Sequence, residues 1–361
     1  MSARDKVLVV GPSWVGDMVM AQALYRLLAK RRPAPDVHVL APAWSLPLIA
    51  RMPEVARGIE MPLGHGDFGL GVRRRIGLRL RAEGYSQAIV LPRSLKAALV
   101  PWFARIPRRT GFRGEWRYGL LTDVRRLDPR LDQTVKRFTA LGIDPPEQPP
   151  FTLPRDLDPR LGVDAANLDR LMRAHGLSDG APVAALMPGA EYGPAKRWPA
   201  ASYAALAGAL AGEGAHVIVL GSAKERPIGD EICAVAASPR VHNLCGVTTL
   251  ADVVDLISAA AVAISNDSGL LHVAAATGTH VVAIYGSSSP AFTPPLTPAA
   301  TVLYRGLDCS PCFARECPLG HLRCLREIAV SEVLDAVGRV FAARERAQPH
   351  TAQAAEEPIR D

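Results

Sequence analysis

Residues 7–20 read VLVVGPSWVGDMVM, and this stretch decides the fold class. A short apolar run, a loop bounded by glycines and a second apolar run predict a buried strand that leads through a turn into a helix. Gly11 and Gly16 stand five positions apart with Trp14 between them. The loop therefore does not match the G-x-G-x-x-G pattern of dinucleotide-binding turns.

Asp17 makes the same loop unsuited to a pyrophosphate. The free N–H groups at a helix N-terminus attract phosphate, whereas a carboxylate at that place repels it. We therefore interpret Asp17 as a base that the turn presents. The structural alternative is that Asp17 only caps a helix beginning near Met18, a role that aspartate often takes.

The composition indicates an α/β protein with two domains. The chain has 361 residues, of which 48% are hydrophobic, 6% aromatic and 21% charged. This length is sufficient for two ordinary domains, each with its own core. Because aromatic residues are few, the cores are expected to be aliphatic, as is typical of α/β layering.

The charge of the chain favours an anionic partner. The formal net charge is +7, and most of the cations are arginines, whose planar guanidinium suits phosphate and carboxylate groups. Nucleic acid is not favoured, because the sequence has no aromatic-studded basic stripe and no recognisable binding module. With neither a signal-peptide pattern nor an apolar run of about 20 residues, we predict a cytoplasmic protein whose membrane contact is peripheral.

Two series of alternating strands and helices are expected. The predicted strands are residues 7–10, 37–41 and 88–91 in the first series and 183–187, 216–220, 262–265 and 280–285 in the second. A proline-rich segment, DPPEQPPFTLPRDLDP at 144–159, predicts an extended connector between them. We therefore predict two Rossmann-like domains facing across a cleft, residues 1–155 and 156–345, followed by a disordered tail at 346–361.

Two loops of the second series are candidates for binding a phosphorylated ligand. Residues 187–199, MPGAEYGPAKRWP, follow a predicted strand, so Lys196 and Arg197 are expected to overhang the cleft. A cation there can neutralise charge on a departing diphosphate, although a solvated basic loop is the alternative. Residues 265–272, SNDSGLLH, predict a helix N-terminus that binds phosphate. The alternatives there are an N-cap role for Asp267 and a core role for His272.

A run of cysteines lies near the end of the second series. Cys309, Cys312, Cys317 and Cys324 have the spacing C-x2-C-x4-C-x6-C, with His321 inside the run. Four thiols this close favour a structural zinc site over disulfides in a cytosolic protein. The spacing does not match paired CxxC motifs, so reduced cysteines that only pack remain the alternative.

Residues 6 to about 330 resemble the ADP-heptose:lipopolysaccharide heptosyltransferases, and most closely their heptosyltransferase II branch. The resemblance rests on GPSWVGDMVMAQALYR at 11–26, LAPAWSLPLIARMPEV at 40–55, RSLKAALVPW at 93–102, RRTGFRGEWRYGLLTD at 108–123, MPGAEYGPAKRWP at 187–199, SNDSGLLHVAAATGT at 265–279 and CSPCFARECPLGHLRC at 309–324. It implies the GT-B fold, with the acceptor largely on the first domain and the nucleotide sugar largely on the second.

The resemblance also implies a reaction. L-glycero-D-manno-heptose would move from ADP-heptose to a heptosyl-Kdo2-lipid A acceptor, with inversion and without a metal ion or other cofactor. Asp17 would be the general base, and Lys196 would support the diphosphate leaving group. The donor would be bound by the residues that match family positions in the second domain: Lys196, Glu225, Asp267, Ser268, Gly269 and His272.

A basic group in the first domain matches the charge of such an acceptor, which carries Kdo carboxylates and lipid A phosphates. The expected acceptor residues are Arg93, Lys96, Arg109, Arg113 and Arg117. A solvated basic surface is the alternative for each of them. Trp44 and Trp102 could add contact with acyl chains, whereas core packing is the expected role of Phe103.

Three other functions remain open at this point. The chain could use the acceptor of heptosyltransferase I, which bears no heptose. It could be a nucleotide-sugar epimerase on the same fold, although an epimerase needs two acid/base groups flanking one sugar and Asp17 supplies one. It could also be a non-catalytic protein that binds anionic lipid through its arginines, with strong salt dependence and no turnover.

Overall fold

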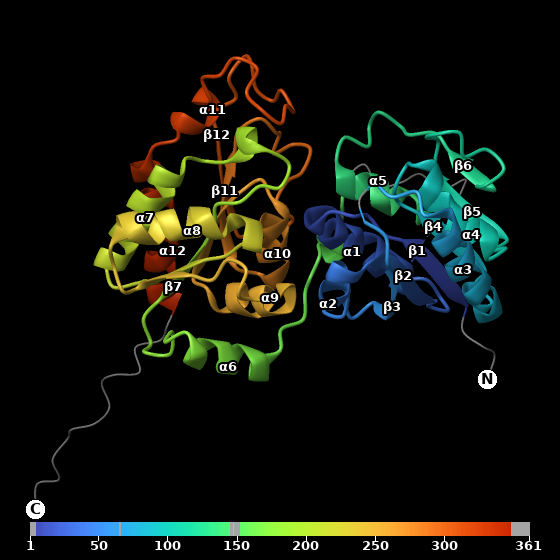
Figure 1. Cartoon of the computed structure of the whole chain (residues 1–361), viewed down its shortest axis with the longest axis horizontal. Helices are drawn as coiled ribbons and strands as arrows, with labels where there is room; N and C mark the ends of the chain where they lie inside the picture. The colour runs from blue at the N-terminus through green and yellow to red at the C-terminus, as the bar shows by residue number, and fades with distance from the viewer. Residues whose placement is uncertain (1–4, 65, 145–146, 148–151, 348–361) are drawn as a thin grey trace, which may run out of the picture.

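The computed structural model describes residues 5–347 except 65, 145–146 and 148–151. The chain forms two parallel sheets, each in its own half of the molecule (Figure 1). In spatial order, the first sheet consists of β3 (Val55–Met61), β2 (Asp36–Pro42), β1 (Lys6–Val10), β4 (Gln87–Val90), β5 (Arg108–Phe112) and β6 (Asp123–Arg125).

The second sheet repeats the strand order of the first. It consists of β12 (Ala300–Tyr304), β11 (His280–Tyr285), β10 (Val262–Asn266), β7 (Val183–Met187), β8 (His216–Val219) and β9 (Val241–Asn243). When the strands of each sheet are counted from its own first strand, the third lies at one edge and the sixth at the other. This is the order 3-2-1-4-5-6 of a Rossmann fold. The α/β architecture predicted from the sequence is confirmed.

Helices cover the sheets on both faces. In the first half the α-helices are α1 (Val15–Ala29), α2 (Leu46–Ile49), α3 (Leu70–Leu80), α4 (Leu99–Phe103) and α5 (Thr134–Ala140). Short 3-10 turns accompany them: η1 (Ala43–Ser45), η2 (Arg81–Glu83), η3 (Leu95–Ala98) and η4 (Arg155–Leu157). Because helices cover both faces, the inner strands are buried on both sides and read as continuous apolar runs.

The second half has its own set of helices. They are α6 (Ala165–Ala174), α7 (Ala200–Gly212), α8 (Arg226–Ala236), α9 (Leu250–Ala259), α10 (Gly269–Thr277), α11 (Arg323–Arg326) and α12 (Val330–Ala347), with the turns η5 (Pro194–Lys196) and η6 (Ala223–Glu225). Local signals fix several starts: Asp164 caps α6, and Thr249 forms a capping box with Asp252 at α9. Among the described residues, no helix is long and apolar enough to cross a bilayer.

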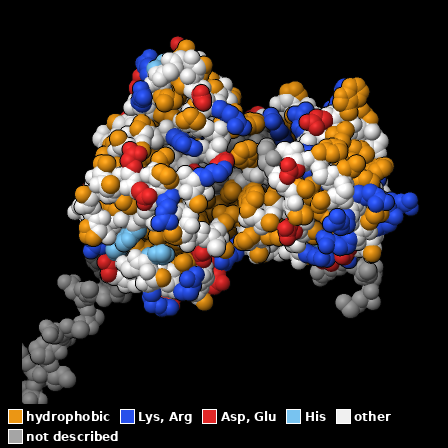
Figure 2. All heavy atoms as spheres, in the orientation of Figure 1, with side chains coloured by type: hydrophobic (Ala, Val, Ile, Leu, Met, Phe, Trp, Pro, Cys, Tyr) orange, Lys and Arg blue, Asp and Glu red, His pale blue; other side chains and the backbone are white. Residues whose placement is uncertain are grey.

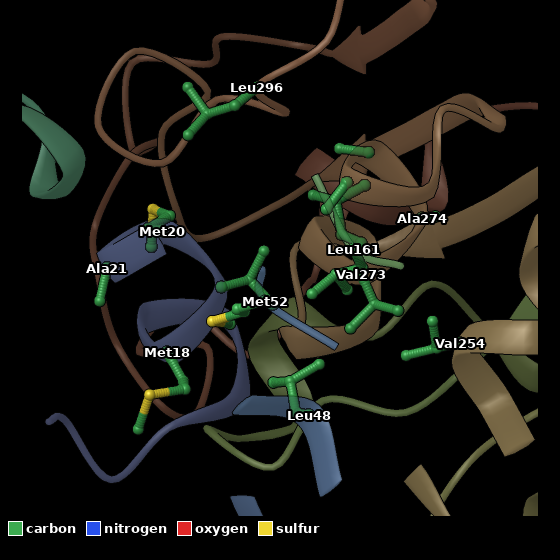
Figure 3. Close-up of a cluster of buried hydrophobic side chains, with 14 of the residues drawn as sticks. Met18, Met20, Ala21, Leu48, Met52, Leu161, Val254, Val273, Ala274 and Leu296 are labelled. Carbon is green, nitrogen blue, oxygen red and sulfur yellow. The ribbon is translucent and has the colours of Figure 1, made fainter. Parts of the chain in front are cut away.

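The two halves share an apolar core. Helices α1 and α2 of the first half pack against α10 and α9 of the second. Met18 and Met20 of α1, with Leu48 of α2, belong to the same buried cluster as Val254 and Val273 (Figure 3). Burial of this many apolar side chains excludes water from the junction. Charges that lie beside it therefore interact in a medium of low dielectric constant.

The strands that sequence analysis did not predict lie mainly at the sheet edges. β3, β6, β9 and β12 are the edge strands of the two sheets, and most of their residues are half-buried or exposed. Such strands lack the continuous apolar run that identifies a central strand. The proposed domain boundary at residue 155 falls within η4 and stays a prediction. Most of the predicted tail, from residue 348, lies outside the described residues.

Candidate active site

Both sheets place loops at the point where the strand order reverses. In the first sheet this point lies between β1 and β4, and in the second between β7 and β10. Connections from such neighbouring strands leave on opposite faces of the sheet, which opens a crevice at the carboxyl ends of the strands. The predicted catalytic and donor loops follow β1, β7 and β10, so the topology brings them to these two crevices.

The crevice of the first sheet is a cavity of about 440 Å³. Its lining comes from the loop after β1 (Gly11, Pro12, Ser13, Trp14), from Asp17, from the ends of β2 and β3 (Pro42, Met61), from Leu63, Gly64 and Arg73, and from the loop after β4 (Leu91, Pro92, Arg93, Ser94, Lys96). The walls are therefore partly apolar and partly basic, with Asp17 as the acid. This combination suits a ligand with an apolar part and anionic groups.

Asp17 lies in the first turn of α1. The helix begins at Val15 with Trp14 as its N-cap residue, and no side chain caps it. The alternative of an N-cap Asp17 is therefore wrong, because Trp14 holds the N-cap position and Asp17 is the third residue of the helix. Among the described residues, none donates a hydrogen bond to the carboxylate.

The surroundings of Asp17 make it a better base than an ordinary carboxylate. Burial raises the pKa of Asp17 from its usual 3.8 to about 6. The positive charge of Lys196 opposes this rise, and the negative charge of Asp267 adds to it. Both residues belong to the second half of the chain. The pKa of Asp17 therefore depends on charges that lie across the junction between the two halves.

Lys196 and Asp267 form a buried ion pair. The Lys196 ammonium lies 2.6 Å from Asp267 Oδ2, with the two side chains 17% and 4% exposed. Thr293 donates a further hydrogen bond to Asp267 Oδ1 over 3.3 Å. Lys196 also lies 5.1 Å from the centre of the Tyr192 ring. The ammonium is thus held in place by a carboxylate and an aromatic face, a geometry that fixes a positive charge at the crevice.

The N-terminus of α10 opens on the same crevice. Ser268 is its N-cap residue, and the Ser268 side chain accepts no capping bond from the helix, so the alternative of an N-cap Asp267 is wrong. Asp267 precedes the cap and turns to Lys196 instead. The backbone N–H groups at the start of α10 have no partners within the helix and can receive an anion. Ser268 and Gly269 lie at this end of the helix, and their phosphate contacts stay a prediction.

His272 lies in the first turns of α10 and is only 4% exposed. Burial lowers the pKa of its imidazole to about 4, so the ring is neutral near pH 7. Its Nδ1 atom is buried and finds no hydrogen-bond partner among the described residues. A buried nitrogen without a partner is costly, and a ligand that bonds to it would remove this cost.

The starts of α1 and α10 touch at two glycines. A Cβ atom on Gly16 would lie 2.7 Å from His272 Cδ2, and one on Gly269 would lie 2.6 Å from Val15 Cβ. Both distances are shorter than van der Waals contact, so only glycine permits this approach. The helix that carries Asp17 therefore meets the helix that opens the second crevice.

Glu225 lies beside the loop after β7. Its Oε2 accepts a 2.7 Å hydrogen bond from the Ser222 N–H as part of the capping box of η6. A Cβ atom on Gly189 would lie 1.5 Å from Glu225 Oε1, so the glycine leaves the space that the carboxylate fills. Glu225 thus lies against the loop after β7 that leads to Lys196.

The predicted acceptor residues separate into two groups. Arg93 and Lys96 line the first cavity, whereas Arg109, Arg113 and Arg117 do not. Arg109 donates to the carbonyl oxygens of Leu120 and Ile106. Arg117 is buried and donates to those of Pro92 and Phe112. The guanidinium groups of Arg109 and Arg117 hold loops together, and their expected acceptor contacts are not supported by this placement.

Sequence analysis missed Arg73, which lines the same cavity. Its guanidinium is buried and donates to the carbonyl oxygens of Phe68, Asp67 and Lys96 over 2.7–3.2 Å. It therefore ties the loop before α3 to the turn that carries Lys96. The run Arg73–Arg75 hides this role, because three consecutive arginines on a helix give no signal of which one points inward.

The cysteine run packs behind the Lys196 loop. Cys309, Cys312, Cys317 and Cys324 line one small cavity together with Ala195 and Ser287. All are free thiols. Within the described residues, no group of three His, Cys, Asp or Glu side chains could hold a metal ion. The zinc hypothesis therefore has no ligand set here, and the run's visible contacts are with the loop that carries Lys196.

Backbone hydrogen bonds show how the cysteine run supports that loop. The Ala195 N–H donates to the carbonyl of Arg315, and the Phe313 N–H donates to that of Ser287. The Tyr192 hydroxyl donates to the Phe313 carbonyl over 2.7 Å. The segment thus braces both Lys196 and the aromatic ring beneath it.

Known proteins are similar to this chain in sequence and fold. A family model described as glycosyltransferase family 9 (heptosyltransferase) matches residues 73–323. Lipopolysaccharide heptosyltransferase 2 of Salmonella typhimurium is 49% identical over 304 residues, covering 82% of this chain and 87% of the relative. Lipooligosaccharide heptosyltransferase 2 of Haemophilus influenzae is 45% identical, covering 82% and 88%. The structure of E. coli ADP-heptose lps heptosyltransferase II matches with a TM-score of 0.83 at 42% identity, covering 94% and 99%.

Proposed function

Because the chain belongs to glycosyltransferase family 9, the heptosyltransferases, we propose that it transfers L-glycero-D-manno-heptose from ADP-heptose to the heptosyl-Kdo2-lipid A inner core of lipopolysaccharide. One observation carries the catalytic part of this proposal. Asp17 lines the cavity of the first domain while its pKa responds to Lys196 and Asp267 of the second. A base on the acceptor side thus lies near a cation on the donor side.

The second crevice is the donor site in this proposal. The diphosphate of ADP-heptose would lie against the N-terminus of α10, with contacts from Ser268, Gly269 and the free nitrogen of His272. Lys196 would stabilise the negative charge that grows on the diphosphate as the glycosidic bond breaks. Glu225, against the loop after β7, would hold the ribose of the nucleotide.

The first crevice is the acceptor site. An acceptor hydroxyl oxygen would attack the anomeric carbon of the heptose from the side opposite the diphosphate, so the configuration inverts. The bond from the anomeric carbon to the diphosphate oxygen breaks, and ADP leaves with the electron pair. Asp17 takes the proton of the attacking hydroxyl. With a pKa of about 6, roughly nine-tenths of Asp17 is ionised at pH 7 and ready to accept it.

Arg93 and Lys96 would receive the anionic groups of the acceptor. They line the cavity on the side of the loop after β4 and are at least partly exposed. Carboxylates and phosphates of a Kdo-lipid A acceptor match their charge. Since such an acceptor is anchored by its lipid, we also propose that the protein works at the inner face of the cytoplasmic membrane as a peripheral protein.

An acceptor-exchange assay tests this function. Purified protein receives ADP-heptose together with Kdo2-lipid A that bears either one heptose or none, and the products are weighed by mass spectrometry. We expect one heptose to be added to the acceptor that already bears one, and little addition to the other. Preferential use of the heptose-free acceptor would contradict the proposed acceptor, and an isomerised sugar without transfer would contradict the transferase.

A further inference from the structure

The positive charge of the chain is concentrated in two short segments. Residues 68–82 and 92–114 together contain eleven Lys and Arg and no Asp or Glu, whereas the whole chain has a net charge of only +7. The rest of the protein is therefore net acidic. Some of these cations are neutralised or buried, since Arg108 pairs with Asp123 and Asp144 and Arg73 donates to carbonyl oxygens. The exposed arginines of the first segment that remain attract anionic surfaces.

The fold packs α3 of the first segment, which carries four of its arginines, against α4 of the second, which is uncharged. A Cβ atom on Gly77 of α3 would lie 2.4 Å from Phe103 Cβ and 2.8 Å from the Val100 carbonyl of α4. Arg81 donates a 2.9 Å hydrogen bond to the Phe103 carbonyl. The two helices thus form one rigid surface, because the missing side chain of Gly77 lets their backbones touch.

The outward side of this pair mixes cations with large apolar side chains. We call the α3–α4 face the surface made by Leu70, Arg74, Arg75, Leu78, Arg79 and Trp102. Leu70 is 47% exposed and Trp102 43% exposed, and the three arginines are exposed. Leu70, Arg74 and Leu78 are four residues apart, so they share one side of α3. In Figure 2 hydrophobic side chains gather on the right-hand domain above a group of Lys and Arg side chains.

The charges of these three arginines are not neutralised by acidic side chains of the described residues. Among the residues that the structure describes, Arg74, Arg75 and Arg79 take part in no ion pair. Exposed tryptophans also concentrate in this half of the molecule: Trp14, Trp44, Trp102 and Trp116 are exposed, whereas Trp198 of the second half is buried. Tryptophan, leucine and arginine on one helical surface are typical of elements that lie in the headgroup region of a bilayer.

The face adjoins the acceptor cavity. Arg73, the neighbour of Arg74 in the chain, lines that cavity and donates to the carbonyl of Lys96. A bilayer that contacts α3 and α4 would therefore lie close to the opening of the cavity. We propose that the α3–α4 face docks the protein on an anionic lipid bilayer, with the arginines on lipid phosphates and Trp102 at the headgroup level. This inference rests on the proposed function only for its purpose, which is access to a lipid-anchored acceptor.

A vesicle-binding experiment tests the docking surface without donor or acceptor. The full chain is sedimented with vesicles of phosphatidylcholine alone or of phosphatidylcholine and phosphatidylglycerol in equal parts. We expect binding to the anionic vesicles only. The triple variant Arg74→Gln/Arg75→Gln/Arg79→Gln should bind about a hundredfold more weakly, since each cation near an anionic surface contributes about fivefold.

A matched control removes the same charge elsewhere. The variant Arg326→Gln/Arg339→Gln/Arg346→Gln changes three exposed arginines of the second half and should bind anionic vesicles within about threefold of the original protein. Trp102→Ser should weaken binding about tenfold by removing the apolar contact. Equal losses in the two triple variants would overturn the proposal, as would failure of the original protein to bind anionic vesicles.

Transfer assays separate this proposal from the proposed function. The face variant should keep the original rate with a delipidated, water-soluble acceptor and lose rate only with an acceptor embedded in anionic vesicles. A loss of rate on both acceptors would overturn the docking role, because the arginines would then act in the reaction itself. If the original protein bound vesicles through this face but transferred heptose to neither acceptor, the proposed function would fail and the docking surface would stand.

Discussion

The loops of the two sheets follow the same backbone plan, but their aspartates have different partners. Each loop lies where the strand order of a Rossmann sheet reverses, and each is completed by the start of a helix, α1 in one case and α10 in the other. Near each helix start lies an aspartate. Asp267 is paired with Lys196 and Thr293, whereas Asp17 receives no hydrogen bond from a described residue.

This difference shows how one fold can supply two chemical roles. A buried carboxylate that is paired with an ammonium stays ionised and holds that cation, which suits the binding of a diphosphate. A carboxylate that is buried without such a partner has a raised pKa and accepts a proton more readily. The strand order sets the positions of both acids, and their partners decide which of them is the base.

The largest expected effect is that of removing the base. Asp17→Asn keeps the shape of the side chain but cannot take a proton, so kcat should fall about a thousandfold. ADP should still bind within about twofold, which titration calorimetry measures, because Asp17 lies on the acceptor side. Asp335→Asn, an exposed change on α12, is the control and should leave kcat unchanged. Transfer by Asp17→Asn within about tenfold of the original rate, a loss near 1.4 kcal/mol, would contradict the assignment.

Removal of the cation is expected to cost less. Lys196→Met should lower kcat about a hundredfold, because one stabilising group for the leaving diphosphate is lost. It also leaves Asp267 buried without its partner, which destabilises the fold. The double variant Lys196→Met/Asp267→Asn should recover the thermal stability without recovering kcat. Recovery of both would mean that Lys196 acts only through the fold.

The contact between the two helix starts gives a smaller effect. Gly269→Ala would place a Cβ atom 2.6 Å from Val15 Cβ, so the helices must separate. We expect a loss of about 2 kcal/mol in the free energy of unfolding and a rate about tenfold lower. Gly338→Ala on α12 is the control, since nothing lies within 4 Å of its Cβ position. It should raise stability by up to about 1 kcal/mol. Equal effects of the two alanines on kcat would argue against a tight junction at the site.

The smallest effect concerns stability and pH. Because the pKa of Asp17 is raised from 3.8 to about 6, the folded protein binds this proton more tightly than the unfolded chain does. The cost of the ionised carboxylate is absent below pH 3.8, grows between 3.8 and 6, and is complete above 6. The free energy of unfolding of Asp17→Asn should therefore exceed that of the original protein by about 1 to 2 kcal/mol at pH 8 and differ little from it near pH 4, which thermal unfolding at the two pH values measures. A variant that is less stable at pH 8 would contradict an Asp17 whose ionised form is destabilised by its surroundings.

The sequence was sufficient for the fold class and for the loops of the site. Continuous apolar runs identified β1, β4, β7 and β10, and these strands border both crevices. The chemistry of Asp17 was also visible, because an acid in a phosphate-type turn conflicts with phosphate binding. Fold and family were thus predictable from local pattern and from motif resemblance.

The partners of individual side chains were not predictable. Arg109 and Arg117 have the charge expected of acceptor residues, but each donates to backbone carbonyls of its own and adjoining loops. Arg73 does line the cavity, although its neighbours Arg74 and Arg75 look identical in sequence. Asp267 turns to Lys196, 71 residues away, in place of capping its own helix. Such choices depend on tertiary contacts that no local pattern records.

The central claim is that Asp17 is the base and that burial sets its pKa. The pH dependence of kcat, measured with saturating ADP-heptose and acceptor, tests this claim most directly. Since only the ionised carboxylate accepts a proton, kcat should fall tenfold per pH unit below a midpoint near 6. In Lys196→Met the midpoint should move to higher pH, because the charge that opposes the rise is gone. A rate that stays constant down to the ordinary pKa of an aspartate, about 3.9, would contradict the account.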